Sequence, residues 1–333
     1  MMSYNQIVLL FLSALPAALL LTVIACRCII PILRKCHIGQ NIYTEGPSWH
    51  ASKQGTPTMG GICFILAMLI SVLPFVALYA RSAQVDVVPL ALTLALGVGN
   101  AMVGFVDDFA KLLHKQNKGL SSLQKLLLQT VVAIAYVFGM AATGHMNTVL
   151  SLEVIGLSLD LGVAYYAFAV LLILAMVNST NLTDGLDGLA SSVTLVAAMC
   201  FSLIGFIACD AQTVVLGAAL IGAMIGFLFF NYHPAKVFMG DTGSLYLGGI
   251  LVGMGLAIDR PILTILISLV FILDMLSSLI QIISYKLCKK RVFLMAPVHH
   301  HFEKKGWSEE KIVYVFSGIA LFFGVLAVII FTL

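Results

Sequence analysis

Charged side chains are scarce in this sequence. Asp, Glu, Lys and Arg make up only 10% of its 333 residues, whereas hydrophobic residues make up 61%. A soluble protein of this length would lack the polar side chains needed to cover its surface, so the composition excludes a soluble globular fold. The chain is therefore predicted to be an all-α polytopic membrane protein, with residues 1–333 forming a single integral membrane domain.

The sequence also lacks Cys-x-x-Cys pairs, and no cleavable leader is expected. The cysteines are Cys26, Cys28, Cys36, Cys63, Cys200, Cys209 and Cys288. Because their number is odd and none has Cys-x-x-Cys spacing, they predict no disulfide framework and are interpreted as small apolar residues in a reducing setting. The N-terminus has no positive charges and no small-residue cleavage site follows it, so residues 6–25 are interpreted as a retained first helix.

Ten apolar runs have the length that a bilayer core requires, about 20 residues. They lie at residues 6–28, 59–80, 87–106, 123–142, 163–178, 189–208, 211–230, 242–258, 261–284 and 312–333. Of the 18 Lys and Arg residues, only Arg81 and Arg260 fall in the connections after the second and eighth runs, and the other 16 lie at the opposite face. By the positive-inside rule, both termini are expected to be extracytoplasmic.

One of the outward connections is longer than the others. Residues 148–161 alternate apolar and polar side chains around Gly156, which predicts a small extracytoplasmic β-hairpin between the fourth and fifth helices. Small residues four apart, at Gly222 with Gly226 and at Gly249 with Gly253, predict close helix contacts. No convincing internal repeat is found, which weakens the case for an inverted-repeat transporter.

A polar run interrupts the apolar pattern at residues 178–188, with the sequence N-S-T-N-L-T-D-G-L-D-G. It lies between apolar segments, so it must sit at a bilayer surface or in a cavity, and the charge pattern puts it on the cytoplasmic side. Two interpretations remain open for the run. It is a solvated turn, since Asn, Asp and Gly dominate ordinary turns, or its amides and carboxylates belong to a site.

Two other inward connections combine charge with unusual spacing. Asp107 and Asp108 follow the third apolar run and suit a hard cation such as Mg²⁺, although they can also be an acidic start to the next helix. Lys53 precedes a Gly-Pro-Gly-Gly pattern that permits close backbone approach to a ligand, with the ammonium available for phosphate. The alternative for Lys53 is a positive-inside residue in a Pro-Gly loop.

The remaining candidates lie before and after the eighth and ninth runs. Asp241 begins a helix between two glycines, as a simple N-cap or as a metal ligand beside a phosphate site. Phe238 is an interface aromatic or a platform for a nucleobase. Three consecutive His, His299 to His301, point in different directions in any regular structure, which disfavours structural zinc. They suit phosphate binding or proton transfer, or they face the surface without a function. Asp274 is an intramembrane carboxylate, functional or satisfied by a buried polar partner.

Five segments on the same predicted side of the membrane together carry a resemblance. They are K-Q-G-T-P-T-M-G-G from Lys53, D-D-F-A-K from Asp107, N-L-T-D-G-L-D-G-L-A from Asn181, N-Y-H-P-A-K-V-F-M-G-D-T-G-S from Asn231 and M-A-P-V-H-H-H-F-E-K-K-G-W from Met295. These segments resemble the polyprenyl-phosphate N-acetylhexosamine-1-phosphate transferases. The triple His is typical of the muramoyl-pentapeptide branch and separates it from relatives that transfer GlcNAc-1-phosphate.

The resemblance implies an activity, a cofactor and partners. Phospho-MurNAc-pentapeptide would pass from UDP-MurNAc-pentapeptide to undecaprenyl phosphate with Mg²⁺, giving lipid I and UMP in the first membrane step of peptidoglycan synthesis. A bacterial plasma membrane, an active site on the cytoplasmic face and a homodimer are expected, with no nucleic-acid partner. Ser179-Thr180 stands where more apolar residues are usual, and Asp274 stands where Glu is common.

The resemblance also implies roles for single residues. Asp241 would hold Mg²⁺, and Asp107 would deprotonate or orient the lipid phosphate with Asp108 completing the acidic pair, so these three are the implied metal ligands. The implied catalytic group is Asp107, Asp108, Asp241 and His299. The uridine side would be formed by Lys53, Gly185, Leu186, Asp187, Asn231 and Phe238. The phosphate and sugar region would be lined by Thr58, Lys111, Lys125, Asn181, Asp184, His299, His300 and His301.

Two alternative functions share some of these features. A sister enzyme that transfers GlcNAc-1-phosphate to a polyprenyl phosphate would need the same carboxylates but not the triple His. An ion-coupled transporter would use Asp274 and the cytoplasmic carboxylates, but its polar residues should cross the membrane instead of gathering on one side.

Overall fold

The computed structural model describes residues 2–35, 53, 55–79, 85–113, 119–152 and 156–333, so Cys36 and Arg81 lie outside the described residues. The helices are α1 Tyr4–Lys35, α2 Gly61–Tyr79, α3 Val88–Leu113, α4 Ser122–Ala142, α5 Ala164–Thr183, α6 Leu189–Ile207, α7 Ala211–Asn231, α8 Gly240–Ala257, α9 Pro261–Ile267, α10 Leu269–Cys288, α11 Val298–Lys304 and α12 Glu309–Phe331. The strands are β1 Val149–Leu152 and β2 Leu157–Asp160. The prediction of an all-α polytopic membrane protein is confirmed.

In the described part of the chain, nine helices are long and apolar enough to cross a membrane, and α8 is not one of them. Its residues 242–256 are all buried, and it packs against α2, α3, α5, α6 and α9. A helix surrounded by protein does not need apolar side chains on every face, so α8 carries polar residues and glycines instead. The Gly249 and Gly253 spacing acts as predicted, because a Cβ added to Gly253 would lie 2.6 Å from Thr93 Cγ2 of α3.

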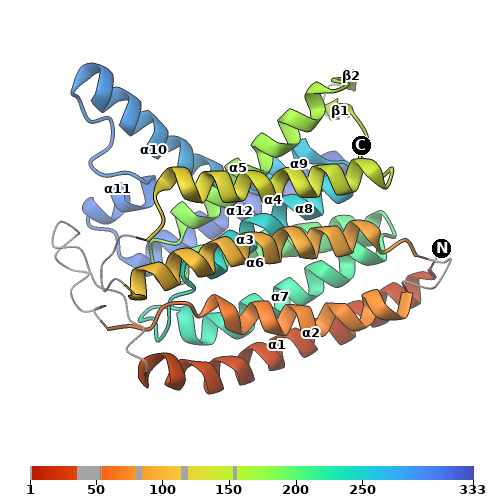
Figure 1. Ribbon diagram of the computed structural model, residues 1–333, viewed down its shortest axis with the longest axis horizontal. Helices are drawn as coiled ribbons and strands as arrows, with labels where there is room; N and C mark the ends of the chain where they lie inside the picture. Colours follow the sequence, from red (N-terminus) through yellow and green to blue (C-terminus); the bar gives the residue numbers. More distant parts are fainter. Residues whose placement is uncertain (1, 36–52, 54, 80–84, 114–118, 153–155) are drawn as a thin grey trace.

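The predicted helix at residues 261–284 is wrong, because the chain forms two helices there. The short α9 ends at Ile267, and the Ser268 N–H bonds to the carbonyls of Leu266 and Thr264. The longer α10 then leaves the bundle and projects beyond the other helices (Figure 1). The residues at this break are neither Pro nor Gly, so the local sequence contains no signal for it.

Both chain ends lie at one end of the bundle, together with the hairpin (Figure 1). The strands β1 and β2 pair antiparallel in the register Val149↔Asp160 to Leu152↔Leu157, which confirms the predicted hairpin. Arg260 stacks on the Phe331 ring near the C-terminus, with a guanidinium-to-centroid distance of 5.7 Å. The connections with the unusual polar residues lie at the opposite end, beside α11 (Figure 1).

Candidate active site

Three carboxylates meet where α3 and α8 cross at that polar end. Ligand oxygens of Asp107, Asp108 and Asp241 all lie within 4.8 Å of one another. The helix α3 continues beyond the apolar run at residues 87–106, through both carboxylates, to Leu113. Lys111, one turn after Asp107, pairs with its carboxylate at 2.7 Å, which favours continuation of the helix through the acidic residues.

Two lysines and an amide bind the Asp241 carboxylate. Lys111 Nζ lies 3.0 Å and Lys125 Nζ 2.9 Å from Asp241 Oδ2. Asn181 donates from Nδ2 to Asp241 Oδ1 at 2.9 Å and accepts from Lys125 Nζ at 3.0 Å. Helices α3, α4, α5 and α8 thus each contribute a side chain to one charged centre, in which two ammonium groups offset part of the charge of the three carboxylates.

Asp108 caps the start of α8 from a neighbouring helix. Its carboxylate accepts the backbone N–H groups of Asp241 at 3.2 Å and Thr242 at 2.9 Å, and the Thr242 hydroxyl at 2.7 Å. The N-cap residue Met239 has no side chain that can do this. The alternative that Asp241 itself is the N-cap is therefore wrong, and its side chain is directed to the charged centre instead.

The donor set of this centre fits a hard divalent cation. All three candidate ligands are carboxylates, and no His or Cys belongs to the group. Mg²⁺ prefers oxygen ligands and binds to one or two protein carboxylates together with substrate phosphates. Asp107 also accepts the Leu120 N–H at 2.7 Å, which holds one of its oxygens in place.

The first half of the polar run is helical, so its interpretation as a turn throughout is wrong. The helix α5 extends to Thr183, and only residues 184–188 form the turn into α6. Hydroxyls in this segment bond to carbonyls of their own helix, for example Ser179 to Met176 at 3.0 Å and Thr183 to Ser179 at 3.0 Å. These internal bonds explain why polar residues are accommodated in a buried helix end.

The turn after α5 places another carboxyl group near the charged centre. Burial raises the pKa of Asp184 well above its usual range, and the carboxylates of Asp241, Asp108 and Asp187 raise it further. Leu186 in the same turn is buried. Thr58 lies close to the start of α8, because a Cβ added to Gly240 would be 2.9 Å from its Oγ1.

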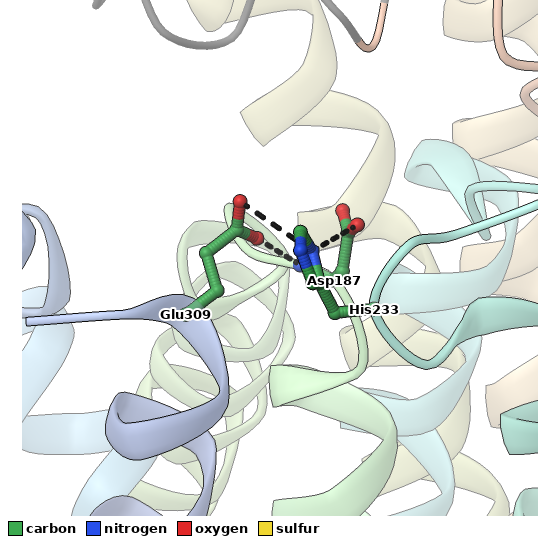
Figure 2. A group of neighbouring side chains, drawn as sticks. All are labelled: Asp187, His233 and Glu309. Carbon is green, nitrogen blue, oxygen red and sulfur yellow. Dashed lines mark hydrogen bonds and ion pairs between the residues drawn. The ribbon is translucent and has the colours of Figure 1, made fainter.

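A second polar cluster brings together Asp187 of the turn after α5, His233 of the connection after α7 and Glu309 of α12 (Figure 2). Lys53 Nζ lies 2.8 Å from Asp187 Oδ1 and 2.6 Å from Glu309 Oε2. His233 Nδ1 lies 3.0 Å from Asp187 Oδ2. No sequence motif pairs Glu309 or His233 with this cluster. Glu309 stands in the first turn of α12, where an acidic residue is expected for the helix dipole alone, so its local sequence carries no further signal.

Two predicted residues of the uridine side belong to the same region. Asn231 is buried and bonds to Ser191 Oγ at 2.8 Å and to the Val237 carbonyl at 3.0 Å, which holds the connection after α7. Phe238 is half-buried, and its N–H donates to the Pro57 carbonyl at 2.8 Å. The glycine-containing connection before α2 packs against this segment, since the Gly60 N–H donates to the Phe238 carbonyl. Protein backbone, rather than a ligand, therefore explains the close approach at Gly60.

The three His lie on the short helix α11, in the connection between α10 and α12. His299 Nδ1 lies 2.8 Å from Asp274 Oδ2, and His300 Nδ1 lies 2.8 Å from Glu303 Oε2. His301 Nδ1 instead accepts the Leu294 N–H at 3.1 Å. The prediction that all three imidazoles point in different directions holds for His301 alone, because the Nε2 atoms of His299 and His300 converge on Gly185. Asp274 has the buried polar partner that one of its two interpretations required.

His299 and His300 face the turn after α5, and His301 does not join them there. A Cβ added to Gly185 would lie 2.5 Å from His299 Nε2 and 3.3 Å from His300 Nε2. The structure therefore brings together Gly185 and two of the three His, whereas His301 contacts the connection before α11 and packs edge-on against Phe293.

Comparison with known proteins identifies relatives along nearly the whole chain. A model described as glycosyl transferase family 4 matches residues 89–259, and phospho-N-acetylmuramoyl-pentapeptide-transferase signature 1 matches residues 53–65. The phospho-N-acetylmuramoyl-pentapeptide-transferase of Halalkalibacterium halodurans is 41% identical over 317 residues, covering 95% of this chain and 96% of the relative. Proteins of the same name from Clostridium beijerinckii and Bacillus subtilis are 42% and 39% identical, covering 87% and 93% of this chain and 87% and 94% of the relatives.

Proposed function

The chain belongs to the phospho-N-acetylmuramoyl-pentapeptide transferase family, and from that membership we infer that it transfers phospho-MurNAc-pentapeptide from UDP-MurNAc-pentapeptide to undecaprenyl phosphate. The products are lipid I and UMP, and the reaction is the first membrane step of peptidoglycan synthesis. The protein is a multi-pass membrane protein. The protein lies in a bacterial plasma membrane, and its active site is at the cytoplasmic face. This placement agrees with the 16 Lys and Arg residues at that face.

One observation supports this activity above the others. Asp107, Asp108 and Asp241 converge from α3 and α8 with Lys111 and Lys125 bound to them. Phosphoryl transfer depends mainly on positioning and charge neutralisation, and it needs little covalent chemistry from the protein. A centre with carboxylates and ammonium groups at hydrogen-bonding distance provides both.

The reaction is a direct displacement at phosphorus. A phosphate oxygen of undecaprenyl phosphate forms a bond to the β-phosphorus of the donor, and the bond from that phosphorus to the bridging oxygen breaks. UMP leaves with the electron pair of the broken bond. Asp107 orients the lipid phosphate and takes a proton from it when it carries one, while the ammonium groups of Lys111 and Lys125 offset the negative charge that gathers between the phosphates.

Asp107, Asp108 and Asp241 would hold Mg²⁺, which when bound neutralises phosphate charge. The donor's uridine would lie beside Lys53, Asp187 and Phe238, with Gly185, Leu186 and Asn231 shaping that side. Its phosphates and sugar would contact Thr58, Asn181, Asp184, His299, His300 and His301. The enzyme works as a homodimer.

UMP release by the purified protein in detergent tests the proposal. The protein receives undecaprenyl phosphate with either UDP-MurNAc-pentapeptide or UDP-GlcNAc, each with Mg²⁺ or with EDTA. Release only with UDP-MurNAc-pentapeptide and Mg²⁺ is the expected result. Release with UDP-GlcNAc would instead identify a GlcNAc-1-phosphate transferase, and substrate accumulation in sealed vesicles without UMP would identify a transporter.

A further inference from the structure

A carboxylate and an imidazole form a fully buried pair between α10 and α11. Asp274 and His299 both have 0% exposure. The Asp274 carboxylate accepts the His299 backbone N–H at Oδ1, at 3.3 Å, and lies 2.8 Å from His299 Nδ1 through Oδ2. Burying a carboxylate in an apolar helix is costly unless hydrogen bonds compensate it, so this pair is a specific arrangement and not a surface contact.

The pair determines which nitrogen of His299 carries the proton. An ionised carboxylate only accepts hydrogen bonds, so Nδ1 must be the donor and, in the neutral ring, Nε2 is left as an acceptor. Among the described residues, Nε2 is buried and has no hydrogen-bond partner. A buried polar atom without a partner in a native site calls for an explanation, and a ligand that completes it is one.

The free Nε2 is directed at the turn that follows α5. A Cβ added to Gly185 would lie 2.5 Å from this atom, so a side chain at this position would occupy the space in front of it. The adjacent His300 repeats the arrangement, with Nδ1 2.8 Å from Glu303 and Nε2 3.3 Å from the same Cβ position. The two rings lie 4.3 Å apart, centroid to centroid. Two carboxylate-held imidazoles therefore present the same nitrogen to one spot beside Asp184.

We propose that Asp274 is a positioning residue for the transfer. By accepting the Nδ1–H of His299, it orients the ring and leaves Nε2 as an acceptor at Gly185 for an O–H or N–H group of the transferred sugar. Such outer partners of a functional His commonly affect activity by about 10-fold to 100-fold. This inference rests on the proposed function, because it assigns the residue a part in binding the UDP-MurNAc-pentapeptide donor.

Steady-state kinetics of three single variants test the positioning role of Asp274. Asp274→Asn removes the charge at nearly constant volume, Asp274→Glu keeps a carboxylate, and Ser278→Ala is the control. Ser278 lies on the same helix, and its hydroxyl donates to the Asp274 backbone carbonyl at 3.4 Å and not to the carboxylate. Asp274→Asn is expected to lower kcat/KM for the donor by about 10-fold or more. KM for undecaprenyl phosphate should stay within about two-fold, Asp274→Glu should restore most of the loss, and Ser278→Ala should match the wild type.

Imidazole ¹⁵N NMR provides a readout that a purely structural role would not change. The signal lost in His299→Gln identifies His299, which should be protonated at Nδ1 in the wild type and lose that preference in Asp274→Asn. A wild-type donor kcat/KM and an unchanged tautomer in Asp274→Asn would overturn the inference. If the wild type itself releases no UMP, the proposed function fails first, and the NMR result still decides whether Asp274 sets the tautomer.

A second variant applies if Asp274→Asn does not fold. Gly185→Ala leaves Asp274 untouched but puts a methyl group in the path of His299 Nε2, since the added Cβ would lie 2.5 Å away. Gly318→Ala is its control, because a Cβ at Gly318 meets nothing within 4 Å. A donor kcat/KM lowered by about 10-fold or more in Gly185→Ala alone supports the inference, and a kcat/KM equal to that of Gly318→Ala overturns it.

Discussion

At the scale of single residues, Asp241 is the carboxylate on which the charged centre depends. It binds two ammonium groups and one amide, at 2.9 to 3.0 Å. Asp241→Asn keeps the size but removes the charge that holds Lys111, Lys125 and the proposed cation. We expect UMP release to fall by about 100-fold or more, with the melting temperature Tm near that of the wild type. The Tm comparison separates lost chemistry from lost folding.

Asp160→Asn is the matched control for that change. Asp160 is an exposed carboxylate of β2, at the end of the molecule away from the charged centre (Figure 1). The same substitution there should leave UMP release unchanged. Full activity in Asp241→Asn, or an equal loss in both variants, would contradict the role assigned to Asp241.

Asp184 predicts a pH dependence of stability. Burial, with help from the carboxylates of Asp241, Asp108 and Asp187, raises its pKa in the folded protein. A carboxyl group with a raised folded pKa stabilises the protein most below its unfolded pKa of about 3.9, and this stability is lost as the pH rises through the raised value. Asp184→Asn mimics the protonated form, so it should raise Tm at pH 8 by about 2–4 °C, with a gap that narrows toward pH 4.

The thermal scans are carried out in detergent between pH 4 and pH 8, without Mg²⁺. Asp160→Asn again serves as the control, because the Gly162 N–H and the Thr148 hydroxyl lower the pKa of the Asp160 carboxyl. That substitution should give no rise in Tm at pH 8. A Tm gap for Asp184→Asn that is absent at pH 8, or that widens as the pH falls, would contradict a raised pKa for the Asp184 carboxyl.

At the scale of helices, the start of α8 depends on a residue of α3. Asp108 accepts three hydrogen bonds from Asp241 and Thr242, so Asp108→Ala leaves buried donors without an acceptor. An unsatisfied buried group costs about 1–3 kcal/mol. Thr242→Val removes only the hydroxyl and should cost about 1 kcal/mol. Asp108→Ala should therefore lower Tm more than Thr242→Val, in thermal scans of both purified proteins.

The same two variants separate two roles of Asp108. If Asp108→Ala abolished UMP release with an unchanged Tm, Asp108 would act on the cation or the substrate and not as a cap. Thr242→Val should retain most of its activity, since it removes the hydroxyl that bonds to Asp108 but keeps the backbone N–H that bonds to the same carboxylate. An activity loss in Thr242→Val equal to that in Asp108→Ala would show that the position of α8, and not the carboxylate itself, limits the reaction.

At the scale of the whole molecule, the chain places both termini and the hairpin opposite the charged centre (Figure 1). Cys209 is exposed in the connection between α6 and α7. Phe206, at the end of α6, packs on Tyr4 near the N-terminus, with 6.2 Å between the ring centroids. Cys288 is exposed at the far end of α10. The proposed orientation therefore predicts that a membrane-impermeant maleimide labels Cys209 in intact spheroplasts and Cys288 only after permeabilisation.

Variants that keep one native cysteine each make this measurement unambiguous. Equal UMP release by both variants is the control for correct folding. The reverse labelling pattern would place the charged centre outside the cell and contradict a cytoplasmic active site, because UDP-linked donors are expected in the cytoplasm.

The sequence by itself determined which segments are buried in the membrane and which residues are chemically unusual. Apolar length and the positions of Lys and Arg are local quantities, so they predicted the spans, the hairpin and the clustering of Asp107, Asp241 and the triple His at one face. They also predicted that the three imidazoles diverge, whereas only His301 points away from the other two. The breaks and ends of the helices were less predictable, because the stop at Ser268 and the extension of α5 to Thr183 depend on hydrogen bonds and packing.

Only the tertiary structure decided which distant residues become partners. Lys53 meets Glu309, Asp108 caps α8, and Asp274 holds His299, across separations that no local spacing encodes. The physical reason is that a buried charge must find a compensating group wherever the fold brings one close, and in a bundle of helices that group usually comes from another helix. Composition specified that such charges exist, and packing specified which pairs they form.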